Sequence, residues 1–275
     1  MSSDTLEFII LGSGSSGGVP RLGGADGSGN WGACDPKNPK NRRLRCSALV
    51  RRVSASGITN ILVDTSPDLR EQLLAARVAN LDAVLITHDH ADQTHGFDDL
   101  RVLFLNHKRR QDVFSDREGL DNLSAKFGYC FVQAQGSGYP AIANAHEIPE
   151  PFHPFEIAGA GGKVPVLAFP QQHGGIRSLG FRFGPFAYSS DVDGLDETAF
   201  TALEGVDTWV VDALRYTPHP SHAHVAKTLE WIARVKPRRA VLTNLHVDLD
   251  YETLKRELPP GVEPAYDGMV LSAPF

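Results

Sequence analysis

The sequence predicts a mixed α/β fold, in the α/β or α+β class, on three observations. The chain of 275 residues is 41% hydrophobic and 22% charged, which is typical of a globular protein. Short apolar runs that indicate strands alternate with helix-like stretches along most of the chain. Most of the predicted strands end in a polar residue. We therefore expect a sheet-based architecture, and we predict a single domain over residues 1–275.

The predicted strands are short and apolar, and they lie at residues 8–11, 48–53, 61–64, 83–87, 164–169, 179–183, 186–190, 209–212, 240–243 and 269–271. Helices are predicted at residues 67–77, 97–106, 223–234 and 251–257. Ser66 is the expected cap of the first helix, with Pro67 at its first position. Between residues 109 and 162 the pattern gives way to Gly, Pro and mixed polar residues. That stretch predicts an insertion or long loops rather than a second core.

Composition and charge exclude several classes of protein. No apolar run approaches the ~20 residues that a membrane-spanning helix needs. Residues 1–5 carry no basic region of a secretory signal, and the three cysteines, Cys34, Cys46 and Cys130, suit a reducing compartment. We therefore expect a cytoplasmic protein without a membrane partner. The formal net charge of −6 argues against broad nucleic-acid binding, although a small anionic ligand is compatible with it.

The segment after the predicted strand 83–87 has the spacing of metal ligands. It reads THDHADQTHG from Thr87 to Gly96. His88 and His90 alternate on one face of an extended chain, so both imidazoles can reach one cation. Asp92 follows at the start of the next helix. The alternative is a polar loop that happens to be rich in His and Asp.

Three further polar residues stand at the ends of later predicted strands. They are His173, Asp191 and His246. Strand ends that reach one rim of a sheet readily form a metal-binding cleft, and imidazole and carboxylate groups are its usual ligands. The sequence therefore predicts a metal site.

These segments resemble the ligand series of the metallo-β-lactamase fold superfamily. Residues 11–20 (LGSGSSGGVP), 219–222 (HPSH) and 265–269 (AYDGM) look most like the cyclic phosphodiesterases of the carbon–phosphorus lyase pathway. The similarity to the tRNA 3′-processing ribonucleases is more distant. The resemblance covers nearly the whole chain. It implies a four-layered αββα sandwich, one or two divalent ions (zinc or manganese) and a homodimer, since the family's members are often dimers.

Carried over to this sequence, the resemblance implies a role for each ligand. His88, His90 and His173 would hold the first metal. Asp191 would bridge to a second metal, to which Asp92 would also belong. Asp92 would in addition orient or deprotonate the attacking water.

The chain departs from the family pattern at two positions. Gln93 and Asn244 stand where the family usually has histidine. Because residues 244 and 246 share a face if the strand persists, we expect His246 to replace the second missing imidazole. The second site is then expected to be weaker, or to prefer an ion such as manganese that accepts oxygen ligands.

His222 opens the predicted helix 223–234, and its interval to Asn244 matches that of an accessory histidine in the cyclic phosphodiesterases. This implies that His222 is a general acid or contacts the phosphate, the alternative being a solvated helix cap. The family's structural zinc uses clustered cysteines. Here eleven residues lie between Cys34 and Cys46, and there is no CxxC pair, which does not favour such a zinc.

The glycine-rich segment 12–18 follows the first predicted strand, but it lacks the ending of a phosphate-binding P-loop. Its glycines are expected to let the backbone pass close to the metal site and to donate N–H groups to a substrate oxygen.

The predicted function is hydrolysis of a small cyclic phosphodiester or nucleotide-like substrate by a metal-bound hydroxide. Two alternatives stay open. One is a thioester or lactone hydrolase that uses the same metals. The other is a non-catalytic carrier or binding protein, because Gln93 and Asn244 can mark a degraded metal site.

Overall fold

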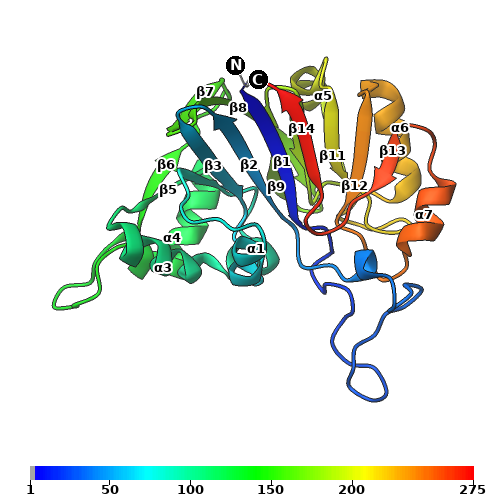
Figure 1. The fold of residues 1–275 in the computed structure, drawn as a ribbon, viewed down its shortest axis with the longest axis horizontal. Coiled ribbons are helices and arrows are strands. Elements are labelled where there is room, and N and C mark those ends of the chain that lie inside the picture. The colour runs from blue at the N-terminus through cyan, green and yellow to red at the C-terminus, as the bar shows by residue number, and fades with distance from the viewer. Residues whose placement is uncertain (1–3) are drawn as a thin grey trace. The chain divides into compact units, whose positions relative to one another are not determined.

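The computed structural model describes residues 4–275; residues 1–3, the start of the stretch in which no secretory signal is expected, lie outside the described part. Within this described part the strands form two seven-stranded sheets (Figure 1). The first has the order β14-β1-β2-β3-β4-β5-β6 and the second the order β13-β12-β11-β10-β9-β8-β7. The strands of the first sheet are β1 (Thr5–Gly12), β2 (Ser47–Ser54), β3 (Gly57–Val63), β4 (Ala83–Leu85), β5 (Gln111–Ser115), β6 (Ala143–Glu147) and β14 (Val270–Pro274). Those of the second are β7 (Phe155–Gly159), β8 (Gly162–His173), β9 (Ile176–Phe183), β10 (Phe186–Ser189), β11 (Thr208–Asp212), β12 (Arg239–Thr243) and β13 (Val262–Pro264).

The helices are short, and none within residues 4–275 has the length and apolar composition needed to cross a membrane. They are α1 (Leu69–Ala75), α2 (Ala91–Thr94), α3 (Leu100–His107), α4 (Arg117–Phe131), α5 (Glu197–Leu203), α6 (Val225–Val235) and α7 (Tyr251–Glu257), with 3₁₀ turns at Pro39–Asn41 and Phe97–Asp99. Helix α1 begins two residues after the predicted Pro67, and Ser66 Oγ instead accepts from the backbone N–H of Asp68 (3.1 Å).

Contacts along the chain gather in two compact units. The first contains the described residues through Ile9 together with residues 47–166 and 270–275, and the second contains residues 10–46 and 167–269. The prediction of one domain over residues 1–275 stays a prediction.

In the first unit, strands β3 to β6 run parallel, and a β2–β3 hairpin is continuous with them. Both β3 and β4 read as apolar runs because their side chains are buried on both faces, which is usual for parallel strands. Helix α4 packs against β5 and β6 (Figure 1). The loop that carries His88 follows the carboxyl end of β4 directly.

The prediction of an insertion or long loops over residues 109–162 is wrong. That stretch contains β5, α4, β6 and β7. Asp116 caps α4 by accepting from the Gly119 N–H (2.8 Å), and the helix buries Leu120 and Leu123. Two glycines lower the helix propensity of α4, and polar residues interrupt the apolar pattern of the strands. These elements therefore could not be predicted from the sequence pattern. Packing against the sheet compensates for that weak propensity.

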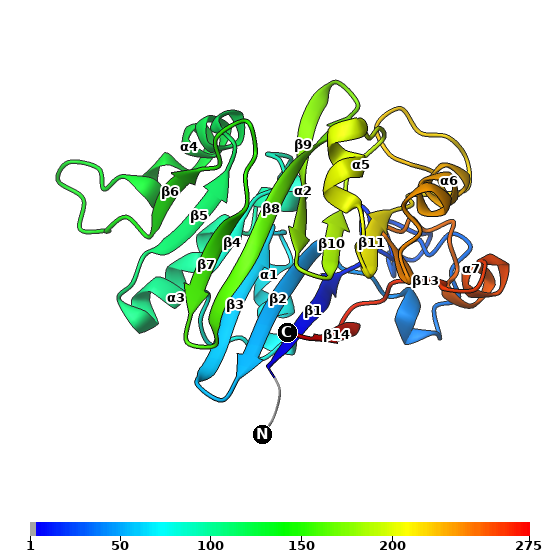
Figure 2. The ribbon, with the colours of Figure 1, turned by 90° about the horizontal axis from the view of Figure 1, so that it is seen from above.

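In the second unit, strands β10 to β13 run parallel, while β9 is antiparallel to β8 and β10. Figure 2 shows helices α5, α6 and α7 beside this sheet. Their apolar side chains share one core with residues of the sheet, including Trp209 and Leu242. Because the carboxyl ends of parallel strands share one edge, the residues that follow β10, β11 and β12 come together there.

The glycine-rich segment after β1 is fixed by a buried carboxylate. Asp267 accepts from the N–H and the hydroxyl of Ser13 (2.9 and 2.7 Å) and from the N–H of Leu44 (2.7 Å). Gly14 is required in this segment, because a Cβ there would lie 2.9 Å from the Cβ of Arg43. Burial raises the pKa of Asp267 to about 6, in spite of these three donors.

This raised pKa predicts a pH-dependent stability. Asp267 has a higher pKa in the folded chain (about 6) than its ordinary value of 3.8, so its contribution is present at low pH and is lost as the pH rises through 6. The free energy of unfolding of the wild type, relative to D267N, should therefore fall by about 2 kcal/mol between pH 4 and pH 7.5. Urea denaturation of both proteins across that range measures it. A difference that does not change with pH would contradict the prediction.

Candidate metal centre

In the first unit, the predicted pair of histidines lies together. The chain leaves β4 at Leu85 and enters α2 at Ala91, and both histidines lie between them. The ring centroids of His88 and His90 are 4.6 Å apart, with the planes at 72°. His88 is buried and His90 is exposed, so the pair spans from the interior to the surface.

His88 is oriented by a buried acid that the sequence analysis did not identify. Asp64 accepts from both the N–H and the hydroxyl of Thr87 (2.8 and 2.9 Å), and Thr87 Oγ1 lies 3.0 Å from His88 Nδ1. Since the Thr87 hydroxyl donates to Asp64, its oxygen accepts from Nδ1–H of His88. The Nε2 atom then carries the lone pair that a metal requires. Burial raises the pKa of Asp64 to about 8, against the effect of the Thr87 hydrogen bonds.

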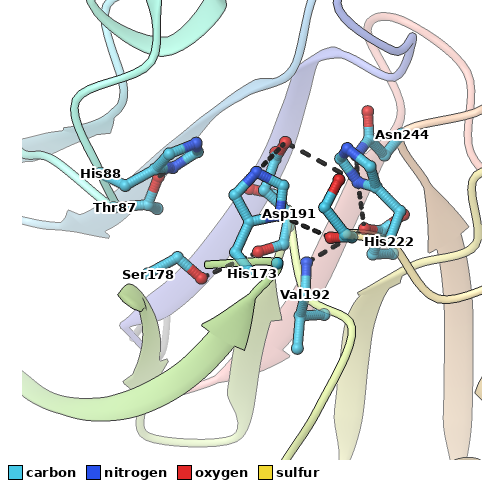
Figure 3. A network of polar contacts seen from close by, with 12 residues as sticks. Thr87, His88, His173, Ser178, Asp191, Val192, His222 and Asn244 are labelled. Atoms are coloured by element: carbon cyan, nitrogen blue, oxygen red, sulfur yellow. Dashed lines mark hydrogen bonds and ion pairs between the residues drawn. The ribbon is translucent and has the colours of Figure 1, made fainter. Parts of the chain in front are cut away.

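In the second unit, three predicted site residues converge. His173, Asp191 and His222 each offer a ligand atom within 4.8 Å of the others (Figure 3). Asp191 Oδ1 lies 3.9 Å from His173 Nε2 and 3.9 Å from His222 Nδ1. His173 Nδ1 lies 2.6 Å from the carbonyl of Ser221, so it donates its hydrogen there, and Nε2 is the nitrogen that faces Asp191.

Asp191 is placed by an unusual backbone conformation. Its φ is +52°, in the left-handed region, directly after β10 and Ser190. The hydroxyl of Ser178 on β9 donates to the Asp191 carbonyl (2.8 Å), and the amide of Gln171 on β8 lies near the Ser190 carbonyl (3.4 Å). The two neighbouring strands therefore stabilise the turn that presents this carboxylate.

His222 is oriented by a second buried acid that the sequence analysis missed. Asp212, the last residue of β11, is fully buried, and its Oδ2 lies 2.9 Å from His222 Nδ1 and accepts from the Val192 N–H (3.1 Å). Burial raises the pKa of Asp212, whereas the charge of His222 and a hydrogen bond from Asn244 lower it. Nδ1–H thus points to Asp212, an arrangement that suits a ring that exchanges protons at Nε2.

The structure removes the argument that favoured His246 as a ligand. Strand β12 ends at Thr243, and Asn244 has a φ of +62°, so residues 244 and 246 do not share a strand face. Asn244 Nδ2 lies 3.1 Å from His222 Nδ1, and His246 Nδ1 lies 3.0 Å from Asp248 Oδ2. A role of His246 in metal binding stays a prediction without that geometric support.

The cysteines of the second unit have separate surroundings. Cys34 Sγ lies against the carbonyls of Val247 and Leu249 (3.3 and 3.4 Å), whereas Cys46 Sγ lies 3.7 Å from the Thr243 hydroxyl. Among residues 4–275, neither cysteine belongs to a group of three side chains that could hold a metal.

Comparisons with known proteins identify the family. Residues 59–244 match the model of the β-lactamase superfamily domain. A crystal structure described as a new diphosphatase from the PhnP family has a TM-score of 0.85 and 30% identity, over 98% of this chain and 97% of its own. Zn²⁺-bound PqqB from Methylobacterium extorquens (TM-score 0.70, 18% identity, 96% and 99% coverage) and the short form of human tRNase Z (0.66, 17%, 98% and 100%) share the fold.

The chain therefore belongs to the metallo-β-lactamase fold superfamily, and within it lies near the PhnP family. The predicted family and fold class are confirmed. Members of this superfamily are mostly hydrolases, and the fold implies use of a divalent metal. The donors fit such an ion, since Nδ1 of His88 and Nδ1 of His173 each lie against a protein oxygen, so that Nε2 is the nitrogen with the lone pair that a metal requires.

A curated relative carries a different name. An octanoyltransferase from Porphyromonas gingivalis (strain ATCC BAA-308 / W83) is 31% identical over 267 residues, which are 96% of this chain and 51% of that protein. The chain thus spans about half the length of the curated relative it matches.

Substitution of Gln93 tests whether this residue weakens the binding of the expected second metal. Gln93 is fully buried at the position where the family usually has histidine. Q93H should raise the zinc content per chain, because imidazole binds zinc better than an amide oxygen does. Elemental analysis of purified protein measures it, with H95A as the control that leaves the content unchanged. Equal zinc in Q93H and wild type would count against the assignment.

Proposed function

We propose that this chain is a metal-dependent phosphodiesterase that hydrolyses a small cyclic phosphodiester or nucleotide-like substrate. The observation that carries the proposal is the Asp212–His222 pair, with Nδ1 of the histidine 2.9 Å from one carboxylate and 3.9 Å from the predicted ligand Asp191. An oriented imidazole beside a metal ligand suits protonation of a departing alkoxide. The 30% identity to a PhnP-family diphosphatase supports phosphoric ester chemistry.

The predicted ligands, His88, His90, Asp92, His173 and Asp191, would hold one or two ions, either zinc or manganese. Their order along the chain follows the series of the family. When bound, the metal supplies an activated water and polarises the phosphoryl oxygens. Asp92 is proposed to orient that water or to accept its proton.

The remaining steps belong to the side chains of the second unit. Asp212 accepts the Nδ1 hydrogen of His222 and stabilises the protonated ring. His222 then delivers the proton on Nε2 to the leaving oxygen as the ester bond breaks. Proposed partners are a small phosphorylated substrate and a second copy of the chain, and neither broad nucleic-acid binding nor a membrane partner is expected. A cytoplasmic location is proposed as well.

The match to an octanoyltransferase supports a second candidate, hydrolysis of an acyl thioester on the same metals. The relative is about twice as long as the matched region, so its name does not assign acyl transfer to the part that resembles this chain. A non-catalytic binding role is the third candidate. It is supported by Gln93 and Asn244, which stand where the family usually has histidine.

One panel of substrates distinguishes the three candidate functions. Purified protein supplied with zinc or manganese is assayed on cyclic nucleotides, cyclic ribose phosphates, linear phosphodiesters and an octanoyl thioester. Hydrolysis of phosphodiesters alone supports the proposal, whereas thioester cleavage without phosphodiesterase activity would replace it by the second candidate. A metal-loaded protein that is inactive on all of them would favour a binding role.

A further inference from the structure

An acid separates the two histidines of the segment between β4 and α2. This segment, residues 86–90, belongs to neither element and is termed the metal loop. Side chains of neighbouring residues in an extended chain lie on opposite sides, so Asp89 is expected to leave the side that His88 and His90 share. Its carboxylate contacts helix α4, where Lys126 Nζ lies 2.7 Å from Asp89 Oδ2. In the described part of the chain, Asp89 belongs to no group of side chains that could hold a metal.

Lys126 makes two contacts with this one residue. Its ammonium group donates to the carboxylate of Asp89 and also to the backbone carbonyl of Asp89. A cation that binds both groups restricts the peptide as well as the side chain. The pair is partly exposed, since 35% of the lysine side chain and 24% of the aspartate side chain are accessible. The contact thus fixes the backbone at the residue between the two imidazoles.

The metal loop is also held on each side of Asp89. Before it, the N–H and the hydroxyl of Thr87 donate to the buried Asp64 (2.8 and 2.9 Å). After it, the Thr94 hydroxyl donates to the carbonyl of His90 (2.8 Å) and lies farther from the carbonyl of Asp89 (3.4 Å). Between these two points, the closest hold on the backbone therefore comes from α4.

Helix α4 is a well-fixed support for this contact. It buries Leu120 and Leu123, and it is kinked at Phe127, with φ −126° and ψ 33°, directly after Lys126. The Phe127 ring stacks on the fully buried ring of Phe97, with centroids 5.4 Å apart. Because Phe97 follows α2 in the chain, α4 contacts the segment after α2 as well as the metal loop before it.

We propose that Lys126 is a positioning residue of the metal centre, which holds Asp89 so that His88 and His90 present their imidazoles to one ion. A partly exposed ion pair contributes little to the free energy of unfolding. Its effect on metal binding is larger, because residues that orient metal ligands typically change metal affinity ~10–100-fold. The inference rests on the metal centre of the proposed function, and it holds whichever ester is cleaved.

Metal affinity measures this role without any substrate. In full-length K126M, zinc should bind ~10-fold or more weakly than in the wild type, in competition with a chromophoric chelator. Urea denaturation of the two metal-free proteins should give nearly equal free energies of unfolding. K126R should recover part of the affinity, because a guanidinium can donate to the same carboxylate. K163M is the matched control, since it breaks an ion pair of the same N–O distance in the same unit, Lys163–Glu156 (2.7 Å).

Two further measurements show whether the lysine acts through Asp89. In the double variant D89A/K126M, zinc should bind little more weakly than in D89A, because the lysine has lost the carboxylate through which it acts. Cobalt(II)-substituted K126M should differ from the wild type in its visible absorption, which reports the geometry of the ligands. K163M should keep the wild-type spectrum.

Three results would overturn the inference. The first is wild-type zinc affinity and cobalt spectrum in K126M. The second is an additive loss of zinc affinity in the double variant. The third is a raised KM with unchanged metal binding, which would make Lys126 a contact of the substrate.

The phosphodiesterase assignment fails in a different way. Zinc binding that depends on Lys126, without hydrolysis of any diester, would retain the inference and overturn the assignment. Hydrolysis of diesters with zinc binding that is insensitive to K126M would do the opposite.

Discussion

Replacing His222 with alanine should slow the hydrolysis of an alkyl phosphodiester by ~10²–10⁴-fold, the usual contribution of a positioned general acid. The alkoxide leaving group needs a proton, and in the proposed mechanism Nε2 of His222 supplies it while Asp212 lies 2.9 Å from Nδ1. A p-nitrophenyl ester should lose far less, because its leaving group scarcely needs protonation. Turnover of the two esters by wild type and H222A, at equal metal content, measures the difference.

Two variants serve as controls for that measurement. D212N should show the same selective loss to a smaller degree, since it disturbs the orientation of His222 and leaves the ring in place. H219A removes a neighbouring histidine, with ring centroids 5.1 Å apart, and should preserve the ratio of the two rates. Equal losses on both esters in H222A would indicate phosphate binding instead. Loss of metal would make His222 a ligand, a role that its place beside His173 and Asp191 also permits.

Removing Asp191, the carboxylate that is proposed to bridge two ions, should have the second large effect. D191N is expected to lower the metal content per chain and to abolish hydrolysis, because a neutral amide is a weaker ligand and leaves the remaining cationic charge uncompensated. H88A should lower the metal content as well, although His88 belongs to the other unit of the chain. Elemental analysis and titration with zinc measure both effects.

Matched substitutions keep this test specific. D193N changes a carboxylate two residues away that accepts from the Gly174 N–H (3.3 Å), and H95A changes a histidine next to α2. Both should retain the metal. If H88A and D191N each removed a separate ion, and the double variant simply summed the two losses, the ligands would not share one centre.

Much of the fold could be predicted from apolar runs, because these runs are the buried strands. Helix α7 spans the predicted residues 251–257, and β12 covers the predicted 240–243 with one further residue. Helix α4 could not be found in this way, since Gly119 and Gly128 lower its intrinsic propensity and its stability comes from packing on β5 and β6. The residues of the helix alone do not indicate that packing.

Part of the site could be predicted from the sequence, because polar residues at the carboxyl ends of parallel strands lie at one edge of the sheet. His173, Asp191 and His222 converge as that rule and the family resemblance imply. Asp64 and Asp212 also end apolar strands, yet they were missed because they act on histidines and are not themselves in the family's ligand series. The geometric argument for His246 failed, since it assumed a strand that persists, and a left-handed residue ends the strand.

Three of the residues that build this site, Asp64, Asp191 and Asn244, have positive φ values of 63°, 52° and 62°. Asparagine, aspartate and histidine enter this conformation more readily than other residues with a side chain, for which it costs about 1–2 kcal/mol. The backbone therefore restricts which chemical groups each position can present. In a saturation scan, we expect each position to fold best with glycine, asparagine, aspartate or histidine. At position 244, the backbone thus accepts the histidine that the family usually has there, so a change from asparagine to histidine would test the ligand chemistry of this position without a large cost in folding.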